Sequence, residues 1–96
     1  MMYMKVFWLQ DRNQPVELLS EIGDDGYEVR KVNIYRDGRQ DFADETRETG
    51  KTFLGLEATP PLEEIQEDEE FEASLISKEE FDKAWKAALA SHGFTE

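Results

Sequence analysis

Hydrophobic residues in the first half of the chain recur at every second position, which is the spacing of β-strands. Residues 3–9 are largely apolar on both alternate sets of positions, so we expect a strand inside a sheet that is covered on both faces. Residues 16–22 and 27–35 predict a second and a third strand. Residues 40–46 are more polar, which suits a fourth strand at the edge of the sheet.

Two turn signals join these strands into hairpins. Residues 23–26, Gly-Asp-Asp-Gly, combine glycines with turn-forming aspartates, and Asp37 followed by Gly38 is among the strongest short hairpin signals. In the strand between the turns, the alternation places Val32 on the same face as Glu28 and Arg30. The strands are therefore expected to pair in antiparallel fashion.

The middle of the chain predicts a short extended segment and then a short helix. Residues 52–57 contain apolar residues that could add a fifth strand to the sheet. Pro61 suits the first position of a helix, which we expect from about Pro61 to Gln66 with Leu62 and Ile65 facing inward.

The end of the chain carries the signals of a longer amphipathic helix. Ser77 and Glu80 match a capping box, and Ile76 with Phe81 matches the accompanying hydrophobic staple. Gly93 is a typical stop signal. One face of the helix is apolar at the spacing of buried positions, with Phe81, Ala84, Trp85, Ala88 and Leu89. We expect Phe81 and Trp85 to be the main contacts with the sheet.

These elements predict an α+β fold, in which an antiparallel sheet of four to five strands carries the carboxy-terminal helix on one face and a short helix after Pro61. The 96 residues are expected to form a single domain over residues 1–96, because a chain of this length has room for one modest core. Strand order is left open.

Composition limits the classes of function. The chain has no cysteine, which excludes disulfides and thiolate metal sites, and no run of about 20 apolar residues that could span a membrane. Its start lacks the pattern of a signal peptide, so a cytoplasmic protein is expected. The net charge of −12 argues against direct binding to nucleic acid and favours a basic partner.

The negative charge is concentrated between residues 52 and 77, a segment that contains eight carboxylates and no lysine or arginine. It has three interpretations: solvated surface, a surface that binds a basic partner, or a cation site. Residues 68–72 lack the glycine and the alternating oxygen ligands of an EF-hand loop, so no metal site is predicted. The candidate partner-binding residues are Glu63, Glu64, Glu67, Asp68, Glu69, Glu70 and Glu72.

A smaller basic and aromatic cluster offers an alternative site. Arg30 and Arg36 lie close in sequence to Tyr27 and Tyr35, and such a sheet surface could bind an anionic small molecule. The same basic residues could equally pair with acids of the chain itself.

No pattern in the chain indicates catalysis. His92 stands near the end without a nucleophile pattern around it and is expected to be an exposed tail residue. Pairs of carboxylates are inevitable among 23 acidic residues and carry no signal. We therefore predict that the protein is not an enzyme and uses no cofactor.

The hairpin from Glu21 to Gly38 resembles that of a family of short bacterial proteins of uncharacterised function. The similarity continues at Trp8, at residues 52–55 and 61–65, and in the helix that contains Ser77, Phe81 and Trp85. It implies no activity and no functional residues. In its small size and acidity the chain also resembles the immunity proteins of bacterial toxin systems, which neutralise cationic nucleases through carboxylate-rich surfaces.

Together these features predict a non-enzymatic cytoplasmic binding protein, in particular an immunity-type inhibitor whose acidic segment meets a basic protein such as a toxin nuclease. The alternative is a small regulatory or ligand-sensing module that binds an anionic small molecule on the sheet. Either could be a monomer or a homodimer.

Overall fold

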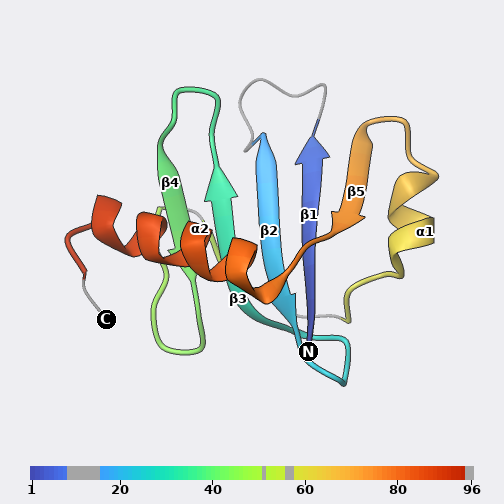
Figure 1. The fold of residues 1–96 in the computed structure, drawn as a ribbon, viewed down its shortest axis with the longest axis horizontal. Coiled ribbons are helices and arrows are strands. Elements are labelled where there is room, and N and C mark those ends of the chain that lie inside the picture. Colours follow the sequence, from blue (N-terminus) through green and yellow to red (C-terminus); the bar gives the residue numbers. More distant parts are fainter. Residues whose placement is uncertain (9–15, 51, 56–57, 95–96) are drawn as a thin grey trace.

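The computed structural model describes residues 1–8, 16–50, 52–55 and 58–94. Five antiparallel strands form one sheet in the order β4-β3-β2-β1-β5 (Figure 1). The strands are β1 (Met2–Trp8), β2 (Glu17–Ile22), β3 (Glu28–Ile34), β4 (Gln40–Ala43) and β5 (Phe71–Leu75), and the helices are α1 (Leu62–Gln66) and α2 (Lys78–Ser91). The predicted α+β fold is confirmed.

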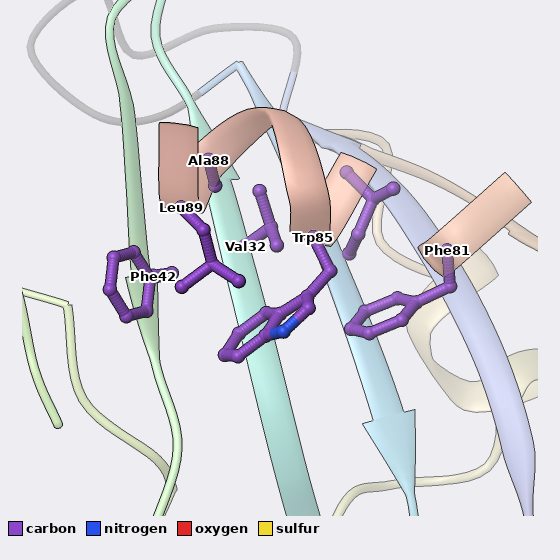
Figure 2. Close-up of a cluster of buried hydrophobic side chains, with 7 residues drawn as sticks. Val32, Phe42, Phe81, Trp85, Ala88 and Leu89 are labelled. Atoms are coloured by element: carbon purple, nitrogen blue, oxygen red, sulfur yellow. The ribbon is translucent and has the colours of Figure 1, made fainter. Parts of the chain in front are cut away.

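Helix α2 crosses one face of the sheet and contacts β4, β3 and β2 (Figure 1). Its apolar face meets the central strands in one core cluster, part of which Figure 2 shows. Phe81 is 0 % and Trp85 1 % exposed, as expected for the main contacts of the helix. Phe42 of β4 meets the Trp85 ring edge-on, with 5.3 Å between the ring centroids. This core anchors α2 to the sheet.

Both ends of α2 are capped. At the start, Ser77 Oγ accepts a hydrogen bond of 3.1 Å from the backbone N–H of Glu80, as predicted. In a complete capping box, the Glu80 carboxylate would also accept a hydrogen bond from the backbone N–H of Ser77. Here that carboxylate instead lies 3.0 Å from Lys5 Nζ on β1. At the end, Gly93 adopts a φ of +80°, and Phe94 N–H donates to Leu89 O over 2.9 Å.

The order of the strands agrees with their sequence character. The apolar strand β1 lies inside the sheet between β2 and β5, whereas the polar strand β4 lies at an edge. β4 ends earlier than predicted, at Ala43, because the Asp44 carboxylate accepts hydrogen bonds from the N–H groups of Thr46 and Arg47 and closes a turn. Both predicted hairpin turns form.

The free side of β4 is covered by two other parts of the chain. Phe42 N–H donates to Thr49 Oγ1 over 2.8 Å, and Thr49 N–H donates back to Phe42 O over 3.0 Å. His92 Nε2 lies 2.7 Å from Gln40 O and 3.1 Å from Asp41 Oδ1. His92 is therefore exposed but held against the sheet, unlike the tail residue that the sequence predicted. This arrangement protects the edge from pairing with another chain.

On the face opposite α2, residues 52–55 lie over β3. Asn33 Nδ2 donates to Thr52 Oγ1 over 3.1 Å, and Gly55 N–H donates to Glu28 Oε1 over 2.6 Å. These residues form no strand, so the predicted fifth strand at residues 52–57 is wrong within the described part, and residues 56–57 lie outside it. Of the described backbone groups of this segment, Gly55 N–H and Phe53 O bond to the side chains of Glu28 and Lys31, whereas Thr52 N–H donates to Thr49 O in the preceding turn.

The fifth strand is β5, which lies inside the acidic segment and pairs with β1. α1 forms where predicted, with Leu62 and Ile65 partly buried, but Pro61 is its N-cap and not its first helical residue. Leu9, predicted to end the first strand, lies outside the described residues.

One face assignment is corrected by a β-bulge. A register shift between Glu21 and Ile22 pairs Glu21 with Arg30 but Ile22 with Glu28. The irregularity moves Glu28 to the face opposite Arg30 and Val32, where it lies 3.0 Å from Lys31 Nζ. The prediction that Glu28 shares a face with Arg30 is therefore wrong.

Candidate functional site

The seven candidate acidic residues all lie along one edge of the molecule. α1 is followed by a tight turn and then by β5, so the helix and the strand run side by side in opposite directions (Figure 1). Gln66 Nε2 of α1 donates to Ala73 O of β5 over 2.5 Å and joins the two elements. We call the exposed carboxylates on this unit the acidic strip: Glu63, Glu64, Glu67, Asp68, Glu69, Glu70 and Glu72.

The turn inside the acidic strip has its own hydrogen bonds. Asp68 Oδ1 accepts from the backbone N–H of Glu70 over 2.9 Å, and Asp68 O accepts from the N–H of Phe71 over 3.1 Å. These bonds fix the backbone between helix and strand. The charged side chains of Glu67, Glu69 and Glu70 are exposed to solvent.

The acidic strip lacks intramolecular counter-ions in the described part of the chain. Among those residues, no lysine or arginine nitrogen lies within 4.0 Å of a carboxylate of the strip. The described ion pairs of basic side chains all use acids elsewhere, with Lys5, Arg30, Lys31, Arg47 and Lys78 as the cations. The strip therefore presents concentrated negative charge to solvent.

The residues of the alternative site are not brought together. Tyr27 precedes β3 and Tyr35 follows it, so the two tyrosines lie at opposite ends of an extended segment, about 25 Å apart. Arg36 is exposed in the β3–β4 turn. Tyr35 faces a different cation, with the Arg39 guanidinium 4.3 Å from its ring centroid.

Arg30, the remaining residue of that alternative, is held between the sheet and α2. Its Nε lies 2.8 Å from Glu21 Oε1, and its Nη2 lies 2.9 Å from Glu21 Oε2 and 3.1 Å from Asp82 Oδ1. The guanidinium also stands over two aromatic rings, 4.9 Å from the Phe81 centroid and 5.1 Å from that of Trp85. Arg30 is thus engaged by two carboxylates and two rings.

This Arg30 network, formed by Arg30, Glu21 and Asp82, shifts the pKa values of its two carboxylates and of the neighbouring Tyr3. The hydrogen bonds from Arg30 lower the pKa of Glu21, which is only 6 % exposed. The hydrogen bond to Glu21 in turn raises the pKa of Tyr3. Lys78 first and then Arg30 lower the pKa of Asp82. Both carboxylates are therefore charged near neutral pH and hold the helix to the sheet.

A pocket of about 400 Å³ adjoins the acidic strip between α1 and the β1–β5 pair. The sequence did not identify it, because its walls come from segments far apart in the chain. The alternation of apolar and polar residues from Phe71 to Leu75 could have revealed the strand, but not the pocket. The pocket is lined by Phe7, Gln66, Phe71, Glu72, Ala73 and Ser74.

The described residues include no group of three or more histidine, cysteine, aspartate or glutamate side chains placed to hold a metal ion. Within the same ranges, no helix has the length and apolar character needed to cross a membrane.

The fold defines a small α+β protein in which one long helix covers one face of a five-stranded antiparallel sheet. The chain belongs to the family DUF6881, described as a domain of unknown function, which it matches over residues 2–90. The predicted resemblance to an uncharacterised family is confirmed. No match was found among curated proteins or among solved structures.

Proposed function

We propose that this protein is a non-enzymatic binding protein whose acidic strip docks onto the basic surface of another protein. The observation that carries the proposal is the contrast in pairing. In the described part of the chain, the ion pairs that lysine and arginine side chains form all use acids elsewhere, whereas the strip has no cation within 4.0 Å. Like charges held this close repel each other, and a cationic partner would relieve that repulsion.

A partner of this kind would be a cationic bacterial toxin such as a nuclease, with this protein acting as its immunity-type inhibitor in the cytoplasm. The support is chemical: a nuclease carries a basic surface for nucleic acid, and an acidic strip on a rigid helix–strand unit could occupy that surface. A ligand-sensing role has less support, because Arg30 is already engaged and the tyrosines of that alternative lie far apart.

The proposal is tested by affinity capture with matched variants. The tagged wild-type protein is compared with a strip variant, Glu67→Gln, Glu69→Gln and Glu70→Gln. The control variant, Asp24→Asn, Glu45→Gln and Glu79→Gln, removes the same charge from exposed sites elsewhere. We expect wild type and control to retain a basic protein at low salt and to release it at high salt, because salt screens surface charge. The strip variant is expected to retain little of it.

Retention of the same protein by the strip variant would contradict the proposal. Capture of no basic protein by wild type at either salt concentration would also contradict it. A circular dichroism spectrum of each variant confirms that the fold is intact before the captures are compared.

A further inference from the structure

The two edges of the sheet differ in how far they are covered. At one edge, Thr49 and His92 bond to the backbone of β4. At the other edge lies β5, with α1 beside it (Figure 1). An uncovered edge strand offers backbone N–H and C=O groups to an extended segment of another chain. Which groups of β5 stay free therefore determines what this edge can bind.

The register of β5 with β1 defines the backbone groups that face this edge. Ile76 N–H donates to Tyr3 O over 2.9 Å. Hydrogen-bonded and non-bonded pairs alternate in an antiparallel ladder. Ser74 therefore also bonds to β1, whereas the backbone N–H and C=O groups of Ala73 and Leu75 point away from it.

Helix α1 covers the beginning of this edge and leaves its end open. Gln66 Nε2 of α1 donates to Ala73 O over 2.5 Å. Among the described residues, neither the N–H nor the carbonyl of Leu75 has a hydrogen-bond partner. The Leu75 side chain is 58 % exposed and lines a pocket of about 210 Å³ with Met1 and Met2, which are also exposed. The end of β5 thus combines a free backbone with an apolar side chain.

We propose that the open end of β5 pairs with an extended segment of the basic partner, in which apolar and basic residues alternate. The inference rests on the proposed function and adds the way in which the partner's backbone is held. A strand added beside Leu75 would send alternate side chains to the two faces of the sheet. On the face of Leu75 they would meet the apolar Met2, whereas on the opposite face they would meet the exposed carboxylate of Glu72.

A second copy of this chain is less suited to this edge. Two β5 strands paired edge to edge would bring one acidic strip close to another, and like charges across an interface cost free energy. A basic segment would instead meet the strip with opposite charge. Charge therefore selects a basic partner segment over self-association.

The inference is tested with two capped pentapeptides of equal charge, Lys-Val-Lys-Val-Lys and Lys-Pro-Lys-Pro-Lys. Proline lacks an N–H group and cannot form the same ladder bonds. Each peptide is titrated into the ¹⁵N-labelled full chain at low salt and followed by NMR. We expect both peptides to shift amide signals of the acidic strip. The valine peptide should bind about tenfold more tightly, because it adds ladder hydrogen bonds.

Hydrogen exchange locates the added strand. In the free chain, the amide of Leu75 should exchange faster than that of Ser74, which bonds to β1. Near saturation, the valine peptide should slow the exchange at Leu75 about tenfold and leave that at Ser74 unchanged. The proline peptide should change neither.

Two variants assign the preference for the valine peptide to this edge. Leu75→Pro removes the N–H that faces the partner, at an edge position where proline is tolerated, and should abolish the preference. Leu75→Thr keeps this N–H in a residue suited to a strand and should keep most of the preference. Circular dichroism checks the fold of both variants, and the exchange of the wild-type Leu75 amide tests the pairing without any variant.

The outcomes separate this inference from the proposed function. Equal binding of both peptides to wild type, a Leu75 amide that the valine peptide does not protect, or a preference that survives Leu75→Pro overturns the strand pairing. Each of these results leaves the acidic strip as the binding surface. Failure of both peptides to shift the signals of the strip contradicts the strip and the strand pairing together.

Discussion

The Arg30 network and the acidic strip use the same carboxylate chemistry in opposite ways. In the network, Glu21 and Asp82 converge on one guanidinium beneath α2, and Glu21 is only 6 % exposed. In the strip, seven carboxylates lie in solvent with no cation within 4.0 Å in the described residues. Paired charges at a buried contact stabilise the fold, whereas unpaired charges on a surface are available to a partner.

The largest change in the free energy of unfolding is expected when the Arg30 network loses its cation, Arg30. Arg30→Met should lower the free energy of unfolding by about 3 kcal/mol, because Glu21 would remain buried without a counter-ion. Arg36→Met, a control in the exposed turn, should change it by less than about 0.5 kcal/mol. Urea unfolding followed by tryptophan fluorescence measures both values. Similar losses for the two variants would show that Arg30 does not anchor α2.

A smaller effect is expected when the network loses one carboxylate. Glu21→Gln should cost about 1.5 kcal/mol near neutral pH, since a charge-assisted pair becomes a neutral hydrogen bond. The folded-state pKa of Glu21 is lowered, so its contribution is fully present above the unfolded-state pKa of about 4.3 and is lost as pH falls through the folded pKa.

The difference in unfolding free energy between wild type and Glu21→Gln should therefore shrink as pH falls below about 4. Urea unfolding at a series of pH values measures it. A difference that stays constant down to low pH would contradict the assignment of that stability to the ionised Glu21.

The smallest change in the free energy of unfolding is expected in the acidic strip, where removing charge should stabilise the protein. The strip variant Glu67→Gln, Glu69→Gln and Glu70→Gln should raise the free energy of unfolding by about 0.5 kcal/mol at low salt, because repulsion between like charges is removed. High salt should reduce this gain. The same urea unfolding experiment at two salt concentrations measures it.

The control for this variant should behave in the opposite way. Asp24→Asn, Glu45→Gln and Glu79→Gln removes an ion pair of Asp24 with the amino terminus and a favourable acid from the first turn of α2, so stability should fall slightly. If the strip variant is also destabilised, its carboxylates contribute to the fold, and the contrast between the two regions is wrong.

The sequence predicted correctly those parts of the fold that are determined by a few residues adjacent in the chain. Ser77 and Gly93 mark the ends of α2 because capping depends on a few neighbouring residues. The strand β5 was missed because its apolar residues, Phe71, Ala73 and Leu75, lie in an acidic context and become a strand by pairing with β1. The bulge that turns Glu28 away from Arg30 is likewise set by pairing.

The candidate functional site likewise has one part that the sequence could predict and another part that it could not. The acidic strip could be predicted, because net charge and its position along the chain are properties of the sequence. The pocket could not, because Phe7 and Gln66 meet Phe71 only once β1, α1 and β5 are assembled. The engagement of Arg30 depends in the same way on Asp82, which lies 52 residues away in the chain.

The central claim is that the unpaired carboxylates of the acidic strip bind a basic partner. Its most direct test is the dissociation constant of the purified partner for wild type, the strip variant and the control variant at low salt. The account predicts that the strip variant binds about tenfold more weakly than wild type, whereas the control variant changes binding by less than about twofold. Equal weakening in both variants would show that only net charge matters. Unchanged binding by the strip variant would show that the partner uses another surface.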